Sequence, residues 1–137
     1  MNIAQIIVFR KDLKVHKGKI GAQVAHASTG GLLKFMLKEF CTDQFDNEYI
    51  KLSTQYTKDS ILGLWLEGEF TKIVLGCDNE EELLELYNKT KDAGLPCCLI
   101  TDNGLTEFNG VKTLTCFSIG PYDRTEINKI TGHLKPL

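Results

Sequence analysis

An uncharged run of seven residues, Ile3–Phe9, lies near the start of the sequence and has the length of a buried β-strand. A basic segment follows, in which five cations accompany a single anion, Asp12, although the whole chain carries a net charge of −2. The spacing of apolar residues then becomes helical. Because N–H groups at a helix N-terminus favour anions, this strand, loop and helix predict a phosphate-binding loop where the sheet ends. The cations are Arg10, Lys11, Lys14, Lys17 and Lys19.

The helix after this loop is predicted to run from near residue 19 to near residue 40. At about 100° per residue, it has one polar stripe and an opposite stripe of mostly small residues. The polar stripe holds Lys19, Gln23, His26 and Gly30, and the opposite stripe holds Gly21, Ala25, Ser28 and Leu32. Because small residues allow close approach, we expect the small stripe to face the sheet and to hold the polar stripe near the strand ends. A solvated polar face of an ordinary amphipathic helix explains the polar stripe equally well.

Three more strand-length segments are predicted, at residues 71–77, 95–100 and 113–119. Two helices begin after Asn79 and after Asp123, each with a glutamate three residues beyond the cap, as in a capping box. No helix separates the last two strands, so we expect them to be antiparallel. The predicted fold class is α/β: a three-layer α/β/α arrangement with a mixed four-stranded sheet, in a single domain of residues 1–137.

The segment from Cys41 to Ser60 has no sustained period. It is predicted to be a variable, insertion-like loop with room for a short helix. A short helical piece at residues 61–67 follows, and its Trp65 is expected to pack on the core.

The composition, 42% hydrophobic and 25% charged, is that of a globular domain and excludes a disordered or fibrous chain. No apolar stretch approaches the ~20 residues of a membrane span, and we expect no signal peptide. The five cysteines form no C-x-x-C pair, so free thiols in a reducing, cytoplasmic compartment are expected. The three histidines have no zinc-ligand spacing, and we expect no metal.

Six ordered blocks of the sequence resemble the signature of the archaeal and eukaryotic type of peptidyl-tRNA hydrolase. They cover nearly the whole chain except residues 41–60. The blocks are Arg10-x-Asp12-Leu13-Lys14-x-x-x-Gly18-Lys19-Ile20-x-Ala22-Gln23-x-Ala25-His26-Ala27; Trp65 before Lys72-Ile73-Val74; Gly94-Leu95-Pro96; Asp102-x-Gly104-x-Thr106; Thr113-x-Thr115 before Ile119-Gly120-Pro121; and Ile130-Thr131-Gly132-His133-Leu134-Lys135.

This resemblance implies a hydrolase without metal or cofactor that cleaves the ester between a peptide and the terminal ribose of tRNA. It implies a dimer with Lys19 and Asp102 as the catalytic pair. Their polar neighbours in the family pattern are Gln23, Thr106 and Thr115. The substrate-binding residues are expected to be Arg10, Lys11, Lys14, Lys17 and His26, the last of them a structural histidine rather than a base.

Ester hydrolysis needs an activated water, stabilisation of the tetrahedral oxyanion and a proton for the leaving hydroxyl. Asp102 can orient or deprotonate the water. Lys19 can stabilise negative charge, either on the oxyanion or on a nearby phosphate. In the absence of the motif, the same two residues would be interpreted as a helix-terminal cation and a turn-forming aspartate.

Two parts of the sequence depart from the family pattern. Asp102-Asn103-Gly104-Leu105-Thr106-Glu107 stands where the family has Asp-Ala-Gly-Arg/Lys-Thr-Gln, and Lys14-Val15-His16 stands where it has Lys-Met-Gly. The lost cation at Leu105 and the added acid at Glu107 predict weaker tRNA binding or a shifted tRNA footprint.

Two other functions remain open from the sequence. One is a catalytically inactive module of the same fold that binds a nucleic acid or a protein. The other is a nucleotide-binding α/β domain, for which the Gly-rich phosphate fingerprint is missing.

Overall fold

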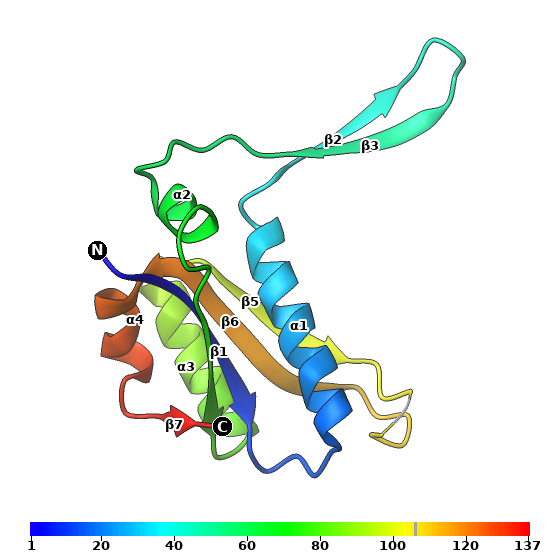
Figure 1. The fold of residues 1–137 in the computed structure, drawn as a ribbon. Helices are drawn as coiled ribbons and strands as arrows, with labels where there is room; N and C mark the ends of the chain where they lie inside the picture. Colours follow the sequence, from blue (N-terminus) through cyan, green and yellow to red (C-terminus); the bar gives the residue numbers. More distant parts are fainter. Residues whose placement is uncertain (106) are drawn as a thin grey trace.

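A mixed sheet of five strands, in the order β5-β6-β1-β4-β7, forms the centre of the protein (Figure 1). The structure is a computed structural model that describes residues 1–105 and 107–137. Strands β1 and β4 are parallel, and the other neighbouring pairs are antiparallel, including the predicted pair β5 and β6. The strands are β1 (Ile3–Arg10), β4 (Lys72–Cys77), β5 (Cys97–Asp102), β6 (Thr113–Asp123) and β7 (Lys135–Pro136).

The predicted α/β class and mixed sheet are confirmed, but the predicted number of four strands is too low. The additional strand, β7, consists of Lys135 and Pro136 paired with β4. A two-residue strand has no alternation that a sequence pattern can detect. Strand β6 also runs beyond the predicted end at Ile119, through a cis peptide bond at Gly120-Pro121, to Asp123.

Helices cover both faces of the sheet, as predicted (Figure 1). Successive residues of β1 point to opposite faces: Ile7 and Phe9 lie in the cluster with α1, whereas Ile6 and Val8 pack with α3 and α4. A third cluster joins α2 to Ile3 through Trp65, which is buried as expected. The helices are α1 (Lys17–Leu33), α2 (Ile61–Leu66), α3 (Glu80–Asp92) and α4 (Arg124–Thr131).

The caps predicted for α3 and α4 are present. Asn79 accepts a hydrogen bond from the N–H of Glu82, and the Glu82 carboxylate accepts one from the N–H of Asp78. Asp123 accepts from the N–H of Thr125. These contacts satisfy N–H groups that the first turn of a helix leaves without an intrahelical partner.

The orientation predicted for α1 is wrong. Its buried residues are Gln23, Ala27 and Gly31, whereas Gly21 and Ala25 of the small stripe are exposed. A polar residue can face the sheet here because hydrogen bonds from the strands satisfy the buried amide of Gln23. The helix also ends at Leu33, well before residue 40, because the chain then enters a strand.

The segment predicted as a loop, 41–60, is largely part of a β-hairpin that extends away from the sheet (Figure 1). It pairs β2 (Leu37–Thr42) with β3 (Glu48–Ser53). Asp43 holds the turn by accepting hydrogen bonds from the N–H groups of Phe45 and Asn47, at 2.8 and 3.0 Å. Both strands are largely exposed, so their sequence lacks the apolar alternation from which a strand is normally predicted.

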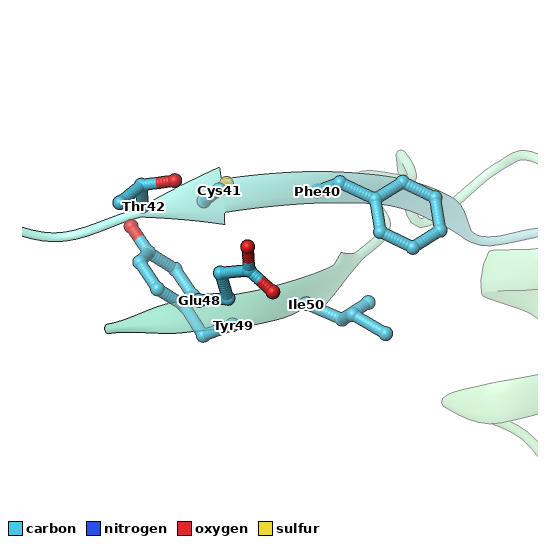
Figure 2. Close-up of a pocket in the computed structure, with 6 residues that line it drawn as sticks. All are labelled: Phe40, Cys41, Thr42, Glu48, Tyr49 and Ile50. Carbon is cyan, nitrogen blue, oxygen red and sulfur yellow. The ribbon is translucent and has the colours of Figure 1, made fainter. Parts of the chain in front are cut away.

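One face of this hairpin carries an exposed apolar patch formed by Phe40, Ile50 and Leu52. Directly opposite residues share a face, and alternate pairs lie on the same side of the ribbon. Phe40 and Ile50 are such a pair, seen together in Figure 2, and they are 80% and 54% exposed. Leu52 lies on the same face, with Lys38 at the base of the hairpin and Glu48 near its tip.

Candidate active site

The topology brings the ends of β1 and β5 to one edge of the sheet. Both strands are antiparallel to β6, which lies between them, so their carboxyl ends point the same way. The segment after β1 leads into α1 with Lys19, and β5 ends at Asp102. The structure therefore joins two residues that are 83 positions apart in the sequence.

Asp102 is held by three donors, two from helix α1 and one from the loop that follows β5. Lys19 Nζ lies 2.7 Å from Asp102 Oδ1, and Gln23 Nε2 donates to the same oxygen at 3.0 Å. The N–H of Gly104 donates to Oδ2 at 2.8 Å. The side chains of Lys19 and Asp102 are 13% and 12% exposed, so the pair is shielded but reachable from solvent.

The hydrogen bond from Lys19 is the main reason that the pKa of Asp102 is lowered. The bonds from Gly104 and Gln23 act in the same direction, and partial burial opposes them. Asp102 is therefore a carboxylate at neutral pH. Its preorganised charge can orient a water, but a carboxyl of lowered pKa is a weak proton acceptor.

Thr115 supports this pair through Gln23. Its Oγ1 donates to Gln23 Oε1 at 2.8 Å, which leaves the amide nitrogen of Gln23 directed at Asp102. Thr115 is fully buried, and Gln23 is 1% exposed. Thr115 therefore positions the amide of Gln23 from inside the protein.

We expect Thr115→Val to lower the free energy of unfolding by about 1–3 kcal/mol, because Gln23 Oε1 would stay buried without its donor. The released amide would no longer fix Asp102, so kcat/KM for a reaction at this pair should fall roughly tenfold. Chemical denaturation and steady-state kinetics measure the two effects. Thr115→Ser keeps the hydroxyl and should retain both values, and equal losses in the two variants would contradict this role.

The two departures from the family pattern meet in the structure. Glu107 accepts a hydrogen bond from the N–H of His16, and its Oε1 lies 2.5 Å from His16 Nδ1. The bond with the His16 side chain is the main reason that the pKa of Glu107 is lowered. The acid expected to repel tRNA is thus paired with a residue that precedes α1. The ring of Phe108 lies 5.6 Å from Lys19 Nζ.

Sequence patterns did not identify His16 and Phe108 as parts of this site. His16 is notable only in lying where the sequence departs from the family motif. No sequence pattern indicated a role for Phe108. Thr106, predicted as a polar neighbour of the pair, lies outside the described residues.

The cations of the basic segment fall into two groups, those that contact acidic residues and those that do not do so within the described residues. Arg10 is bound to Asp12 through two hydrogen bonds and donates to the carbonyl of Leu114 at 2.9 Å, so it links β1 to β6. Lys11 pairs with Asp78 at 3.1 Å. Lys14 and Lys17 are exposed, and no ion pair is formed by either within residues 1–105 and 107–137.

His26 is exposed on α1, beyond Gln23, and does not belong to the core. The five cysteines are free thiols, of which Cys77 and Cys116 are buried. Burial raises the pKa of each of these two thiols to about 11, which makes them poor nucleophiles.

The part of the chain that the structure describes contains no group of three or more His, Cys, Asp or Glu side chains that could hold a metal ion. In the same part, no helix has the length and apolar character required to cross a membrane.

Fold and site together define an α/β protein with a shielded lysine–aspartate pair at the sheet edge, next to a basic loop. The family model described as peptidyl-tRNA hydrolase PTH2 matches residues 3–137. The chain therefore belongs to the PTH2 family of peptidyl-tRNA hydrolases.

Several curated relatives are named peptidyl-tRNA hydrolase. That of Methanopyrus kandleri is 41% identical, over 95% of this chain and 94% of its own. The peptidyl-tRNA hydrolase of Methanothermobacter thermautotrophicus is 37% identical, over 97% of this chain and 98% of its own length. A solved structure of a protein of unknown function from Agrobacterium has a TM-score of 0.53 at 13% identity, covering 100% of this chain and 98% of the other, and supports the fold alone.

Proposed function

We propose that this chain hydrolyses the ester between a peptide and the terminal ribose of tRNA, with Lys19 and Asp102 as its catalytic residues. Water adds to the ester carbonyl carbon, and the bond from that carbon to the ribose oxygen breaks. The products are a peptide carboxylate, a tRNA with a free hydroxyl, and one proton. The observation that carries the proposal is the 2.7 Å contact between Lys19 Nζ and Asp102 Oδ1 in a chain of this family.

Asp102 is proposed to orient the attacking water. A carboxylate has about four acceptor positions, and the described residues use three of them. The fourth, on Oδ2, suits a water molecule. Lys19 then supplies positive charge for the oxyanion that forms when this water adds to the carbonyl, while Gln23 keeps the carboxylate in place.

Turnover of N-acetylaminoacyl-tRNA by the wild-type chain tests this function. We expect release of free tRNA well above the spontaneous rate, measured by acid-gel separation of acylated and free tRNA. Tight binding of the acylated tRNA without turnover would overturn the proposal in favour of a binding module.

The basic segment is proposed to bind the tRNA backbone. In the same loop, Arg10 and Lys11 are paired with acids. Lys14 and Lys17 are exposed cations for which the described part of the chain provides no ion pair. Pairing with an acid reduces the charge available to a phosphate. Lys14 and Lys17 should therefore contribute most of the attraction, with His26 near the acylated end of the tRNA.

We expect replacement of both Lys14 and Lys17 by alanine to reduce the slope of log K against log salt by about 1.5, because two phosphate contacts would be lost. Lys11→Ala should reduce it by less than half of that amount. Fluorescence anisotropy of labelled tRNA over a salt series measures the slopes. Lys89→Ala, an exposed lysine of α3 paired with Glu85, serves as the control. A Lys11 effect as large as that of the double variant would contradict this assignment.

Two copies of the chain are proposed to associate through the hairpin face that carries the apolar patch of Phe40, Ile50 and Leu52. A two-stranded ribbon with exposed apolar side chains gains stability by packing on another surface. Lys38 and Glu48 lie at opposite ends of that face. In an antiparallel two-fold arrangement, the end with Lys38 on one hairpin would meet the end with Glu48 on the other.

Sedimentation equilibrium at micromolar concentration should give the mass of a dimer for the wild-type chain and of a monomer for Phe40→Lys. Phe45→Lys changes a similarly exposed aromatic residue at the turn and should remain a dimer. A wild-type monomer, or a dimer that persists in Phe40→Lys, would rule out this interface.

Residues 1–137 are proposed to act as one domain in the cytoplasm. A tRNA substrate and five free thiols fit that compartment.

A further inference from the structure

An open groove leads away from the catalytic pair, between α1 and β5. Its volume is about 480 Å³. On α1 it begins at His26, less than one turn after Gln23, and on β5 it ends at Thr101, directly before Asp102. Its walls are formed by His26, Thr29, Gly30, Leu33, Leu99, Ile100 and Thr101.

The helix lies close to β5 because Gly30 has no side chain. A Cβ atom at this position would lie 2.7 Å from Cys98 Sγ. The side chains of Cys98 and Ile100 are thus covered by α1, whereas the outer edge of β5 borders the groove.

β5 is an edge strand, with β6 on one side and no strand on the other among the described residues. Gly120 N–H donates to the carbonyl of Pro96 at 2.8 Å. This bond shows which residues of β5 direct their backbone groups toward β6. Hydrogen-bonded positions alternate along such a ladder. Pro96, Cys98 and Ile100 therefore face β6, and the backbone N–H and C=O groups of Cys97 and Leu99 point outward from the sheet.

We propose that the peptide part of peptidyl-tRNA binds along β5 as an additional strand, parallel to it. This inference rests on the proposed function, because the ester must lie at Lys19 and Asp102. The ester is at the carboxyl end of the peptide, so the peptide runs from the Cys97 end of β5 toward Asp102. The outward N–H and C=O groups then pair with the peptide backbone.

Backbone pairing suits this substrate because it is independent of side chains. From His26 to Leu33, α1 rises about 10 Å, which corresponds to roughly three residues of extended peptide. The groove therefore distinguishes a peptidyl group from a single acylated amino acid by its length.

Leu99→Pro tests the proposal, because it removes the backbone N–H of Leu99 that would bind the peptide. This N–H points outward and is not bonded to β6, so proline is tolerated at this edge position. Leu99→Ala is the matched control for the lost side chain. Relative to that control, kcat/KM for N-acetyltetrapeptidyl-tRNA should fall about tenfold, as expected for loss of one hydrogen bond in the bound substrate. The value for N-acetylaminoacyl-tRNA should stay unchanged. Equal effects on the two substrates, or none, would overturn the proposal.

A second experiment keeps the wild-type protein and changes the substrate. N-methylation of one peptide amide at a time should lower kcat/KM about tenfold at alternate residues and have little effect at the residues between them. A loss without this period of two would overturn strand addition. Turnover of N-acetylaminoacyl-tRNA reports the proposed hydrolysis itself, so its absence would identify failure of that function rather than of the peptide subsite.

Discussion

Replacing Asp102 by asparagine is expected to lower kcat/KM for acylated tRNA by about 10²–10³-fold. Asparagine keeps the shape of the side chain but removes the charge that faces Lys19 Nζ at 2.7 Å. Its amide would also present a donor to Lys19 or Gln23, both of which donate to Asp102 Oδ1. The remaining oxygen would orient water poorly.

Lys19→Ala should cause a loss of similar size, because no other described cation contacts Asp102. Single-turnover hydrolysis with the variants in excess separates the chemical step from tRNA binding. Lys89→Ala and Asp92→Asn, on the exposed surface of α3, are matched controls that should retain the wild-type rate. Wild-type rates in Lys19→Ala and Asp102→Asn would exclude this pair from the reaction.

The pH profile provides an independent check on Asp102. Its pKa is lowered, so the carboxylate persists below the ordinary aspartate value of about 3.9. The stability that its ionised form contributes is present above the unfolded pKa and is lost as pH falls through the folded pKa. Protonation of Asp102 should therefore not reduce the rate between pH 7 and about 5. An acid limb near pH 6 that disappears in Asp102→Asn would contradict this expectation.

Gly104→Ala is expected to lower kcat/KM by about 10²-fold, because it displaces the loop that holds Asp102. Gly104 has φ +77°, and a Cβ atom there would lie 2.3 Å from the carbonyl oxygen of Val111 and 2.6 Å from its nitrogen. These are backbone atoms, which cannot rotate away. Moving the loop would withdraw the Gly104 N–H from Asp102 Oδ2.

Gly110→Ala is the matched control in the same loop. Gly110 has a similar φ of +78°, but a Cβ atom there would have nothing within 4 Å. Kinetics and thermal unfolding of the two variants separate backbone strain from the clash. We expect a small loss of activity and a small fall in the unfolding temperature for Gly110→Ala, and a larger fall in the unfolding temperature for Gly104→Ala, because only that variant adds the clash to the cost of positive φ. If Gly104→Ala and Gly110→Ala lost the same activity, positive φ alone would explain the loss and the clash with Val111 would not.

Local patterns were sufficient where a segment is stabilised by its own neighbours. Asn79 and Glu82 predicted the beginning of α3, because the hydrogen bonds that cap it are formed within residues 78–82. The run Ile3–Phe9 predicted β1, because a strand covered on both faces is apolar along nearly its whole length, here at every position except Gln5. The family motif supplied Lys19 and Asp102 as partners, although their spacing in the sequence does not suggest contact.

Patterns failed where distant contacts override local character. The helical pattern fitted a solvated Gln23 as well as one held near the strand ends, and Gln23 is buried because Thr115 of β6 and Asp102 of β5 satisfy its amide. The hairpin of β2 and β3 was missed because pairing between the two strands, rather than burial, holds it together.

The sequence by itself determined the α/β class, the mixed sheet and the family, because these depend on strand-length apolar runs, helix caps and ordered motifs. Only the tertiary structure decided which face of α1 meets the sheet, that Glu107 pairs with His16, and that β5 has a free edge beside the site. The physical reason is that the hydrogen bonds at this edge of the sheet join residues 83 to 92 positions apart, whose pairing depends on strand order and not on local spacing.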